Sequence, residues 1–168
     1  MNNFTKSTPS SLQKVTLGKT MTSILLAGNN PSHLSVVYEM LRDFKRKEFT
    51  IYTAFTLEDS LKRVFQYQPQ CILLDDTLGR KNIKSFIHKL QQHKLEKINK
   101  IPVILLKTSH KQEMPSSGIM DFLLKQGLTA DKLGFTLLKV IKLKKTHNTF
   151  YRTYRLSRRK LRRFFRKF

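Results

Sequence analysis

The sequence predicts an α/β domain built on a five-stranded, doubly wound parallel sheet with right-handed crossovers. Short apolar runs alternate five times with segments of helical periodicity between Thr22 and Lys145, the pattern of repeated strand–helix units. The central run, Cys71–Leu74, is apolar at every position, which is typical of a strand buried on both faces of a parallel sheet. Carboxylates follow it at once, at the strand end where such sheets place their chemistry.

The expected strands share short length and a high content of apolar, β-branched or aromatic residues. They are Ile24–Ala27, Phe49–Phe55, Cys71–Leu74, Pro102–Leu106 and Phe122–Leu124.

The expected helices carry apolar residues at spacings of three and four. Ser32 is placed to cap the first helix, and Thr129 the last, which has Asp131 in its first turn. A helix within Lys107–Met120 should be weak or irregular, because that segment contains a proline and a glycine. The apolar positions of the first three helices are Leu34, Val37, Leu41 and Phe44; Leu57, Leu61, Val64 and Phe65; and Ile83, Phe86, Ile87 and Leu90.

Composition indicates a domain with anionic partners. The 168 residues include 33 Lys and Arg against 11 Asp and Glu, a formal charge of +22, which favours nucleic acid, an acidic protein or an anionic membrane face. The single cysteine, Cys71, excludes an intramolecular disulfide framework and fits a reducing compartment. No apolar run approaches the roughly 20 residues of a membrane span, and residues 1–21 lack the apolar centre of a signal peptide. We therefore expect a cytoplasmic protein.

The chain divides into three expected regions. Residues 1–21 are rich in Ser, Thr and Lys and predict a disordered leader, either dispensable or upstream of a true start at Met21. Residues 22–145 form the α/β domain, and residues 146–168 form a basic amphipathic helical tail. A chain truncated after a linker helix, as the front end of a longer signalling protein, is a further possibility.

Four fragments carry a resemblance to a known family. PQCILLDDTLG, IPVILLKT, GIMDFLLK and ILLAGNNP resemble the third, fourth, fifth and first strands of response-regulator receiver domains from two-component phosphorelay signalling. The resemblance covers roughly Thr22 to Lys145 and implies the flavodoxin-like receiver topology. It also implies that Asp75 stands at the phosphoacceptor position and Lys125 at the position of the family's lysine.

Several positions depart from the family pattern. Gly28 and Asn29 stand where the family has two acidic residues that hold magnesium. Lys107 stands where the family has a hydroxyl residue, with Thr108 one position later. Gln126 replaces the usual proline, and the connection between the fourth and fifth strands is about one helical turn shorter than usual.

These departures predict a degraded magnesium site. Mg²⁺ requires hard oxygen ligands in near-octahedral array, and Asp75 with the amide of Asn29 makes a poor set. Asp76 would add a carboxylate if the chain bends after the strand, but we expect it to be a loop residue. Asp75, Lys107 and Lys125 would sum to +1, so we do not expect Mg²⁺ as a cofactor.

The hypothesis is that Lys125, alone or with Lys107, pairs with Asp75 and takes the place of the metal. The domain would then be a pseudo-receiver fixed in one state. The alternative is that Asp75 only caps the following helix. No Ser/His/Asp order, phosphate-cradling glycine loop or metal-spaced histidine pair is present, so we expect no enzymatic activity.

The tail leaves several interpretations open. Apolar residues recur from Leu133 to Phe168 at helical spacing, which predicts that the last helix continues beyond the domain. It could form a coiled-coil homodimer, lie on an anionic membrane or bind nucleic-acid phosphates; a solvated tail is the fourth interpretation. Its densest basic cluster is Arg158, Arg159, Lys160, Arg162 and Arg163.

The functional prediction is a signalling module that acts by protein–protein contact with a kinase or output protein. A phosphotransfer version keeps Asp75 as acceptor and Lys125 as the residue that contacts the phosphoryl group. The alternative is a nucleic-acid- or membrane-binding protein for which the receiver fold is a scaffold.

Overall fold

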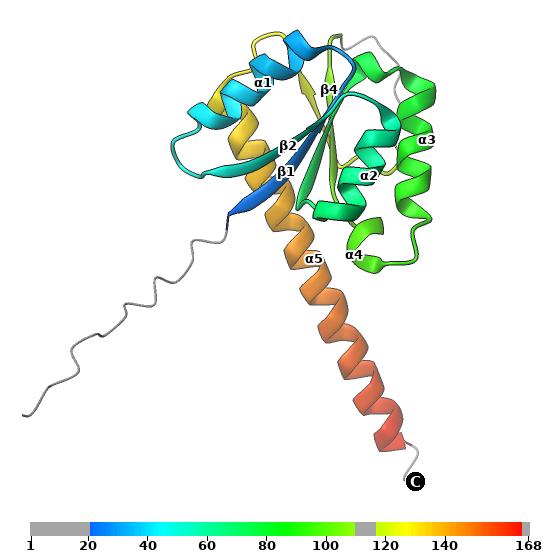
Figure 1. Cartoon of the computed structure of the whole chain (residues 1–168). Coiled ribbons are helices and arrows are strands. Elements are labelled where there is room, and N and C mark those ends of the chain that lie inside the picture. Colours follow the sequence, from blue (N-terminus) through cyan, green and yellow to red (C-terminus); the bar gives the residue numbers. More distant parts are fainter. Residues whose placement is uncertain (1–20, 110–116, 166–168) are drawn as a thin grey trace, which may run out of the picture.

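A computed structural model of the chain describes residues 21–109 and 117–165. Residues 1–20 of the predicted leader, residues 110–116 of the segment 107–120 and the side chains of the tail's basic cluster lie outside the described residues. Five parallel strands form one sheet in the order β2-β1-β3-β4-β5, which confirms the predicted α/β class (Figure 1). The strands are β1 (Thr22–Ala27), β2 (Phe49–Ala54), β3 (Cys71–Asp75), β4 (Val103–Lys107) and β5 (Asp121–Leu124).

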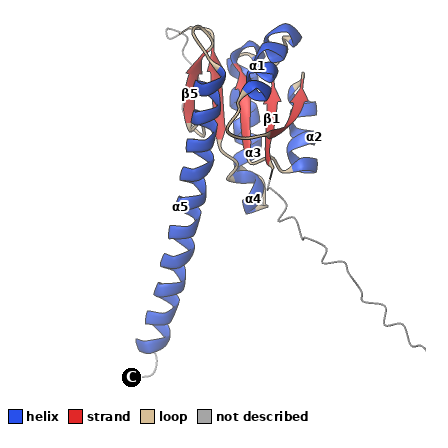
Figure 2. Cartoon of the chain, turned by 90° about the vertical axis from the view of Figure 1, so that its left-hand side faces the viewer, coloured by secondary structure: helices blue, strands red, loops and turns tan. Residues whose placement is uncertain are grey.

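Helices cover both faces of the sheet (Figures 1 and 2). Helices α1 and α5 pack on one face, and α2, α3 and α4 lie on the other. A single 3₁₀ turn, η1 (Asp76–Leu78), joins β3 to α3. The helices are α1 (Pro31–Asp43), α2 (Leu57–Tyr67), α3 (Arg80–Gln91), α4 (Glu96–Asn99) and α5 (Ala130–Phe165).

Two details of the helices differ from the sequence expectation. Asn30, not Ser32, caps α1: its side-chain oxygen accepts hydrogen bonds from the backbone N–H groups of Ser32 and His33, at 3.1 and 3.3 Å. Pro31 then occupies the first turn, where its missing N–H costs nothing. The short helix α4 was not predicted, because four residues cannot show a helical period.

Strand β3 lies at the centre of the core. All five of its residues are buried, and its side chains alternate between the two apolar layers. Cys71 is fully buried, and burial raises the pKa of its thiol to about 12, so it acts as a small apolar residue.

Helix α5 crosses the whole height of the sheet and continues past it (Figure 2). Within the domain, Gly134 allows the close approach of the α1–β2 connection: a Cβ atom there would lie 2.4 Å from Cδ2 of Phe44. Among the described residues, no helix is both long enough and apolar enough to cross a bilayer.

Candidate functional site: an ion-paired crevice at the carboxyl edge of the sheet

Parallel pairing brings the carboxyl ends of β1, β3, β4 and β5 to one edge of the sheet, as the sequence predicted. Four side chains from three strand ends meet there: Asp75, Asp76, Thr108 and Lys125. The backbone continues the pairing at this point, because the N–H of Lys125 donates to the carbonyl of Lys107 at 2.9 Å. This fixes the base of the Lys125 side chain beside the end of β4.

Lys125 joins both carboxylates. Its Nζ atom lies 2.8 Å from Oδ1 of Asp75 and 2.6 Å from Oδ1 of Asp76, and it donates to Oγ1 of Thr108 at 3.3 Å. The side chains of Asp75 and Asp76 are almost completely buried, at 0% and 3% exposure. The side chain of Lys125 is 18% exposed. The ammonium group therefore shields two buried negative charges from one another.

Asp76 is a central member of the site, contrary to the expectation of a loop carboxylate. The 3₁₀ turn after β3 directs its side chain to the end of β4, where the backbone N–H of Thr108 donates to Oδ2 at 2.6 Å and the Thr108 hydroxyl donates to Oδ1 at 3.0 Å. Burial alone would raise the pKa of Asp76. The hydrogen bonds and charge of Lys125, together with those hydrogen bonds from Thr108, outweigh burial and hold that pKa below its ordinary value.

Asp75 receives all its hydrogen bonds on one oxygen. Besides Lys125, the backbone N–H and the hydroxyl of Thr77 donate to Oδ1, at 2.8 and 2.5 Å. Asp75 thus caps the 3₁₀ turn, while α3 begins separately after Gly79. Oδ2 is buried and accepts no hydrogen bond from the described residues. Asp75 therefore caps the turn that follows β3, close to the capping alternative, and also pairs with Lys125, as the ion-pair hypothesis states.

Gly28 brings β1 into close contact with Asp75. A Cβ atom at Gly28 would lie 2.7 Å from Cβ of Asp75 and 3.0 Å from Cδ2 of Leu34. The volume that any larger side chain needs here is already occupied by Asp75. The neighbouring residue, Asn29, is exposed to solvent in the bend after β1.

Lys107 requires a correction to the predicted crevice. Its ammonium group lies 5.5 Å from the centre of the Phe122 ring, whereas Thr108 supplies the hydroxyl group that contacts Asp76. The alternation of side chains along β4 explains the difference, since successive residues point to opposite sides of the sheet. The three charged side chains that these contacts join, Asp75, Asp76 and Lys125, sum to −1, whereas the predicted +1 counted Lys107 and left out Asp76.

Three of the four carboxylate oxygens that a magnesium ion could use at Asp75 and Asp76 already accept hydrogen bonds. Oδ1 of each aspartate is already bonded to Lys125, and both oxygens of Asp76 accept hydrogen bonds from Thr108. Gly28 offers no ligand, and no group of three or more His, Cys, Asp or Glu side chains suited to a metal occurs in the described part of the chain. Mg²⁺ would have to compete with these hydrogen bonds at every carboxylate oxygen of the pair except Oδ2 of Asp75, which accepts none from the described residues.

One contributor, Thr77, was missed at the sequence level. Its signal is the run Asp-Asp-Thr: a threonine two residues after an aspartate at a strand end is well placed to donate back to that carboxylate. The predicted polyanion-binding residues, by contrast, are far along α5 and have no described side-chain contacts.

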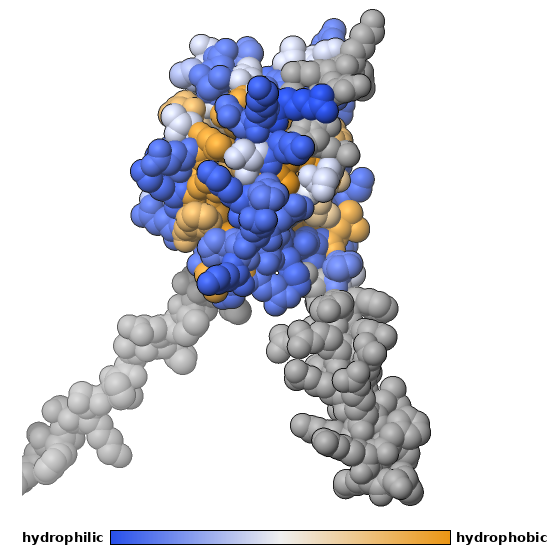
Figure 3. All heavy atoms as spheres, turned by 90° about the vertical axis from the view of Figure 1, so that its right-hand side faces the viewer, coloured by the Kyte–Doolittle hydropathy of each residue, from blue (hydrophilic) through white to orange (hydrophobic). Residues whose placement is uncertain are grey.

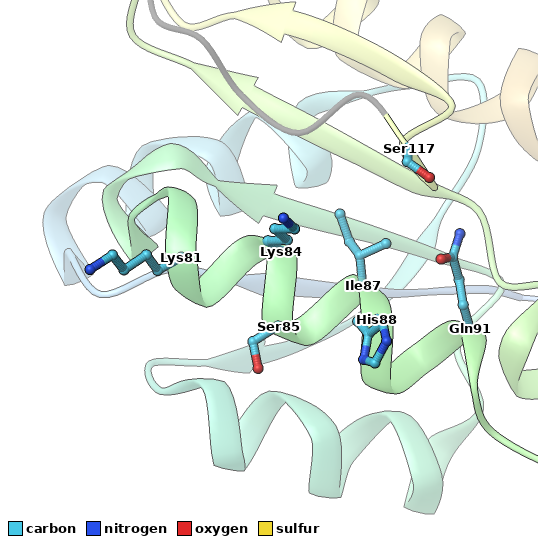
Figure 4. A pocket seen from close by; sticks show the side chains of 7 residues that line it. All are labelled: Lys81, Lys84, Ser85, Ile87, His88, Gln91 and Ser117. Atoms are coloured by element: carbon cyan, nitrogen blue, oxygen red, sulfur yellow. The ribbon is translucent and has the colours of Figure 1, made fainter.

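A separate pocket of about 510 Å³ lies on the outside of α3 (Figure 4). Lys84, Ile87 and Gln91 project from α3 toward Ser117, whereas Ser85 and His88 project from the other side of the helix. Among the described residues, none of the predicted site residues lines it.

No family model and no curated protein sequence matches the chain. Solved structures do. The receiver domain of the sensor histidine kinase PA1611 from Pseudomonas aeruginosa superposes with a TM-score of 0.63 at 21% identity, over 73% of this chain and 98% of the other. The chemotaxis response regulator CheY4 of Vibrio cholerae gives 0.60 at 21% identity, over 72% and 99%.

The NtrX protein of Brucella abortus gives a TM-score of 0.64 at 17% identity; the match covers 79% of this chain but 29% of that longer one. These likenesses confirm the receiver fold implied by the four sequence fragments. The chain therefore has the three-dimensional fold of response-regulator receiver domains.

Proposed function

We propose that this chain is a response-regulator-like signalling module that acts by protein–protein contact and does not depend on phosphorylation. The observation that carries the proposal is the bond of the Lys125 ammonium group to Asp75 and Asp76 at 2.8 and 2.6 Å. The PA1611 receiver domain is described with a magnesium ion coordinated in its active-site cleft. Here a lysine supplies the positive charge in the corresponding crevice.

Electrostatics supports this exchange of metal for lysine. At an effective dielectric of about 20, unit charges about 4 Å apart attract by about 4 kcal/mol before the cost of desolvation is counted. Lys125 makes two such contacts, both at shorter distance. A magnesium ion would have to overcome both, without the acidic side chains that Gly28 and Asn29 replace. The partners of such a module would be a kinase or an output protein, in keeping with neighbours that include a sensor-kinase receiver domain and a receiver-modulated diguanylate cyclase from Pelobacter carbinolicus.

The test is incubation with acetyl phosphate and Mg²⁺, followed by intact-mass measurement, with a phosphorylatable receiver domain in the same tube as positive control. We expect phosphate on the control and none on this chain. The Asp75→Asn variant identifies the acceptor if mass is gained. Phosphate that appears on the native chain and disappears in this variant would contradict phosphorylation independence and favour the phosphotransfer version.

A second candidate function is polyanion binding through the tail. The observation that favours it is that α5 continues as one helix to Phe165, carrying the basic cluster Arg158–Arg163 out from the domain, in a chain of formal charge +22. Nucleic acid and anionic membrane are both suited to such a helix. Replacing Arg158, Arg159 and Lys160 by Gln in the full chain should weaken binding to DNA, RNA or anionic vesicles and flatten its salt dependence. Unchanged binding would exclude the tail as the binding element.

A further inference from the structure

A second charged region lies at the opposite edge of the sheet, where the strands begin. A pocket of about 270 Å³ is formed by the residues that lead into β3 and β4, by α4 and by the middle of α5. Its charged and amide-bearing lining residues are Gln68, Gln70, Glu96, Lys97, Lys100, Lys144 and Lys145. We call this the basic pocket.

Positive charge exceeds negative charge in the basic pocket. Four lysines line it against one carboxylate, Glu96, and that carboxylate is paired with Lys100 one turn along α4. Within the described part of the chain, Lys97, Lys144 and Lys145 have no ion-pair partner. Burial lowers the pKa of Lys144, and the charge of nearby Lys100 lowers it further.

A polar group without a partner lines the same pocket. The side-chain oxygen of Gln70 is buried and accepts no hydrogen bond from the described residues. The Gln70 backbone is fixed, because its N–H donates to the carbonyl of Ser23 at 2.8 Å. Because this oxygen has almost no accessible surface, a ligand's hydroxyl donor reaches it only when the side-chain amide turns toward the pocket.

We propose that the basic pocket binds a phosphate group of an RNA strand, with lysines 97, 144 and 145 facing the phosphate and Gln70 accepting a hydrogen bond from a ribose hydroxyl. A phosphate satisfies the excess ammonium charge, and the 2′-hydroxyl is the donor that distinguishes RNA from DNA. A polyanion fits better than a single small anion, because the four lysines at α4 and on α5 present more positive charge than one small anion balances.

An anionic membrane is the less suitable partner for this pocket. Membrane docking requires apolar side chains that insert beside the basic ones. The two isoleucines that line the pocket, Ile101 and Ile141, are buried at 8% and 6% exposure and cannot insert. The face of the domain that carries α4 is also largely hydrophilic in its lower part (Figure 3).

The proposal concerns the folded domain and depends neither on the state of the crevice nor on the cluster Arg158–Arg163. The test uses the full chain and a fluorescent single-stranded RNA oligonucleotide, with DNA of the same sequence and anionic vesicles as the other arms. The pocket variant is Lys97→Gln/Lys144→Gln. The matched control is Lys139→Gln/Lys142→Gln, which removes two exposed charges from α5 outside the pocket.

We expect the pocket variant to weaken RNA binding about tenfold and to reduce the slope of log affinity against log salt by about one phosphate contact. The control should weaken binding about two- to threefold, through its general charge alone. Gln70→Leu, which retains every charge, should remove the preference for RNA over DNA and leave DNA affinity unchanged. The folding of each variant is checked by its thermal unfolding midpoint.

A local readout keeps the proposal testable if the tail dominates affinity. The side-chain amide of Gln70 should shift in NMR spectra on RNA addition, and should not shift in the Lys97→Gln/Lys144→Gln variant. Equal effects of the pocket and control variants, a silent Gln70 amide, or loss of vesicle binding alone would overturn the proposal.

Discussion

The two edges of the sheet differ in how far carboxylates balance the charge of their lysines. At the carboxyl edge, one ammonium group, that of Lys125, lies between two buried carboxylates and is matched by them. At the amino edge, four lysines surround the basic pocket with a single carboxylate. The first arrangement pairs its charges within the folded chain except at Oδ2 of Asp75 and keeps a formal charge of −1, whereas the second has an excess of positive charge. The comparison teaches that a strongly basic domain can contain one buried acidic pair that shares a single lysine and one pocket in which lysines predominate.

The largest expected effect on stability comes from removing Lys125 from the crevice at the carboxyl edge. Lys125→Met leaves Asp75 and Asp76 buried and unpaired, so the free energy of unfolding at neutral pH should fall by about 3–5 kcal/mol. Chemical denaturation measures it. Lys139→Met, which removes an exposed lysine of α5, serves as control and should change stability by less than about 0.5 kcal/mol. Equal losses in the two variants would show that the crevice pairing contributes nothing.

Asp76→Asn tests the second carboxylate and predicts a pH dependence. Loss of charge-assisted bonds to Lys125 and Thr108 should lower stability by about 2 kcal/mol at neutral pH. Because the folded pKa of Asp76 lies below its unfolded value of 3.8, its stabilisation is present above that value and is lost as pH falls through the folded pKa. The native chain should therefore lose more stability on acidification than the variant. Parallel pH profiles would contradict the assignment.

Gly28→Ala tests the close packing that excludes a ligand side chain from β1. The added Cβ atom would meet Cβ of Asp75 at 2.7 Å, which should cost about 1–2 kcal/mol by overpacking. Asn29→Ala, at the exposed neighbouring residue, is the control and should be nearly neutral. A Gly28→Ala variant as stable as the native chain would mean that the end of β1 can shift to accommodate a side chain. An acidic residue could then be introduced at this position.

The smallest effect should have the opposite sign. Lys144→Met removes one of several like charges from the basic pocket and should stabilise the chain slightly, by less than about 1 kcal/mol, whereas Lys139→Met should not. Thermal unfolding at low salt, where charge repulsion is least screened, is the sensitive measurement. A clear loss of stability in Lys144→Met would show that its ammonium group is already compensated within the chain.

The sequence predicted the fold well, because alternating apolar runs constrain a parallel sheet strongly. The apolar run Cys71–Leu74 correctly predicted a buried strand, and the resemblance of four fragments to receiver-domain strands implied the topology. The site was predicted in part. Asp75 and Lys125 follow from their strand ends, but the position of Asp76 depends on a 3₁₀ turn, and the choice of Thr108 over Lys107 depends on a one-residue alternation along β4.

Other features had no sequence signal of their own. The basic pocket joins Gln70, α4 and the middle of α5, which are distant in sequence and meet only through the crossover connections. The close contact between Gly28 and Asp75 depends on the spacing of two neighbouring strand ends. A residue pattern does not reveal differences of a few tenths of an ångström in that spacing.

The central claim is that Lys125 occupies the place of a metal in the crevice. An NMR titration of the full chain with Mg²⁺ into the millimolar range tests it most directly, observed at the backbone amides of Asp75, Asp76, Thr108 and Lys125. The account predicts no saturable shift in the native chain and a new saturable response only when Lys125 is replaced by Met. Saturable magnesium binding by the native chain at these amides would contradict it.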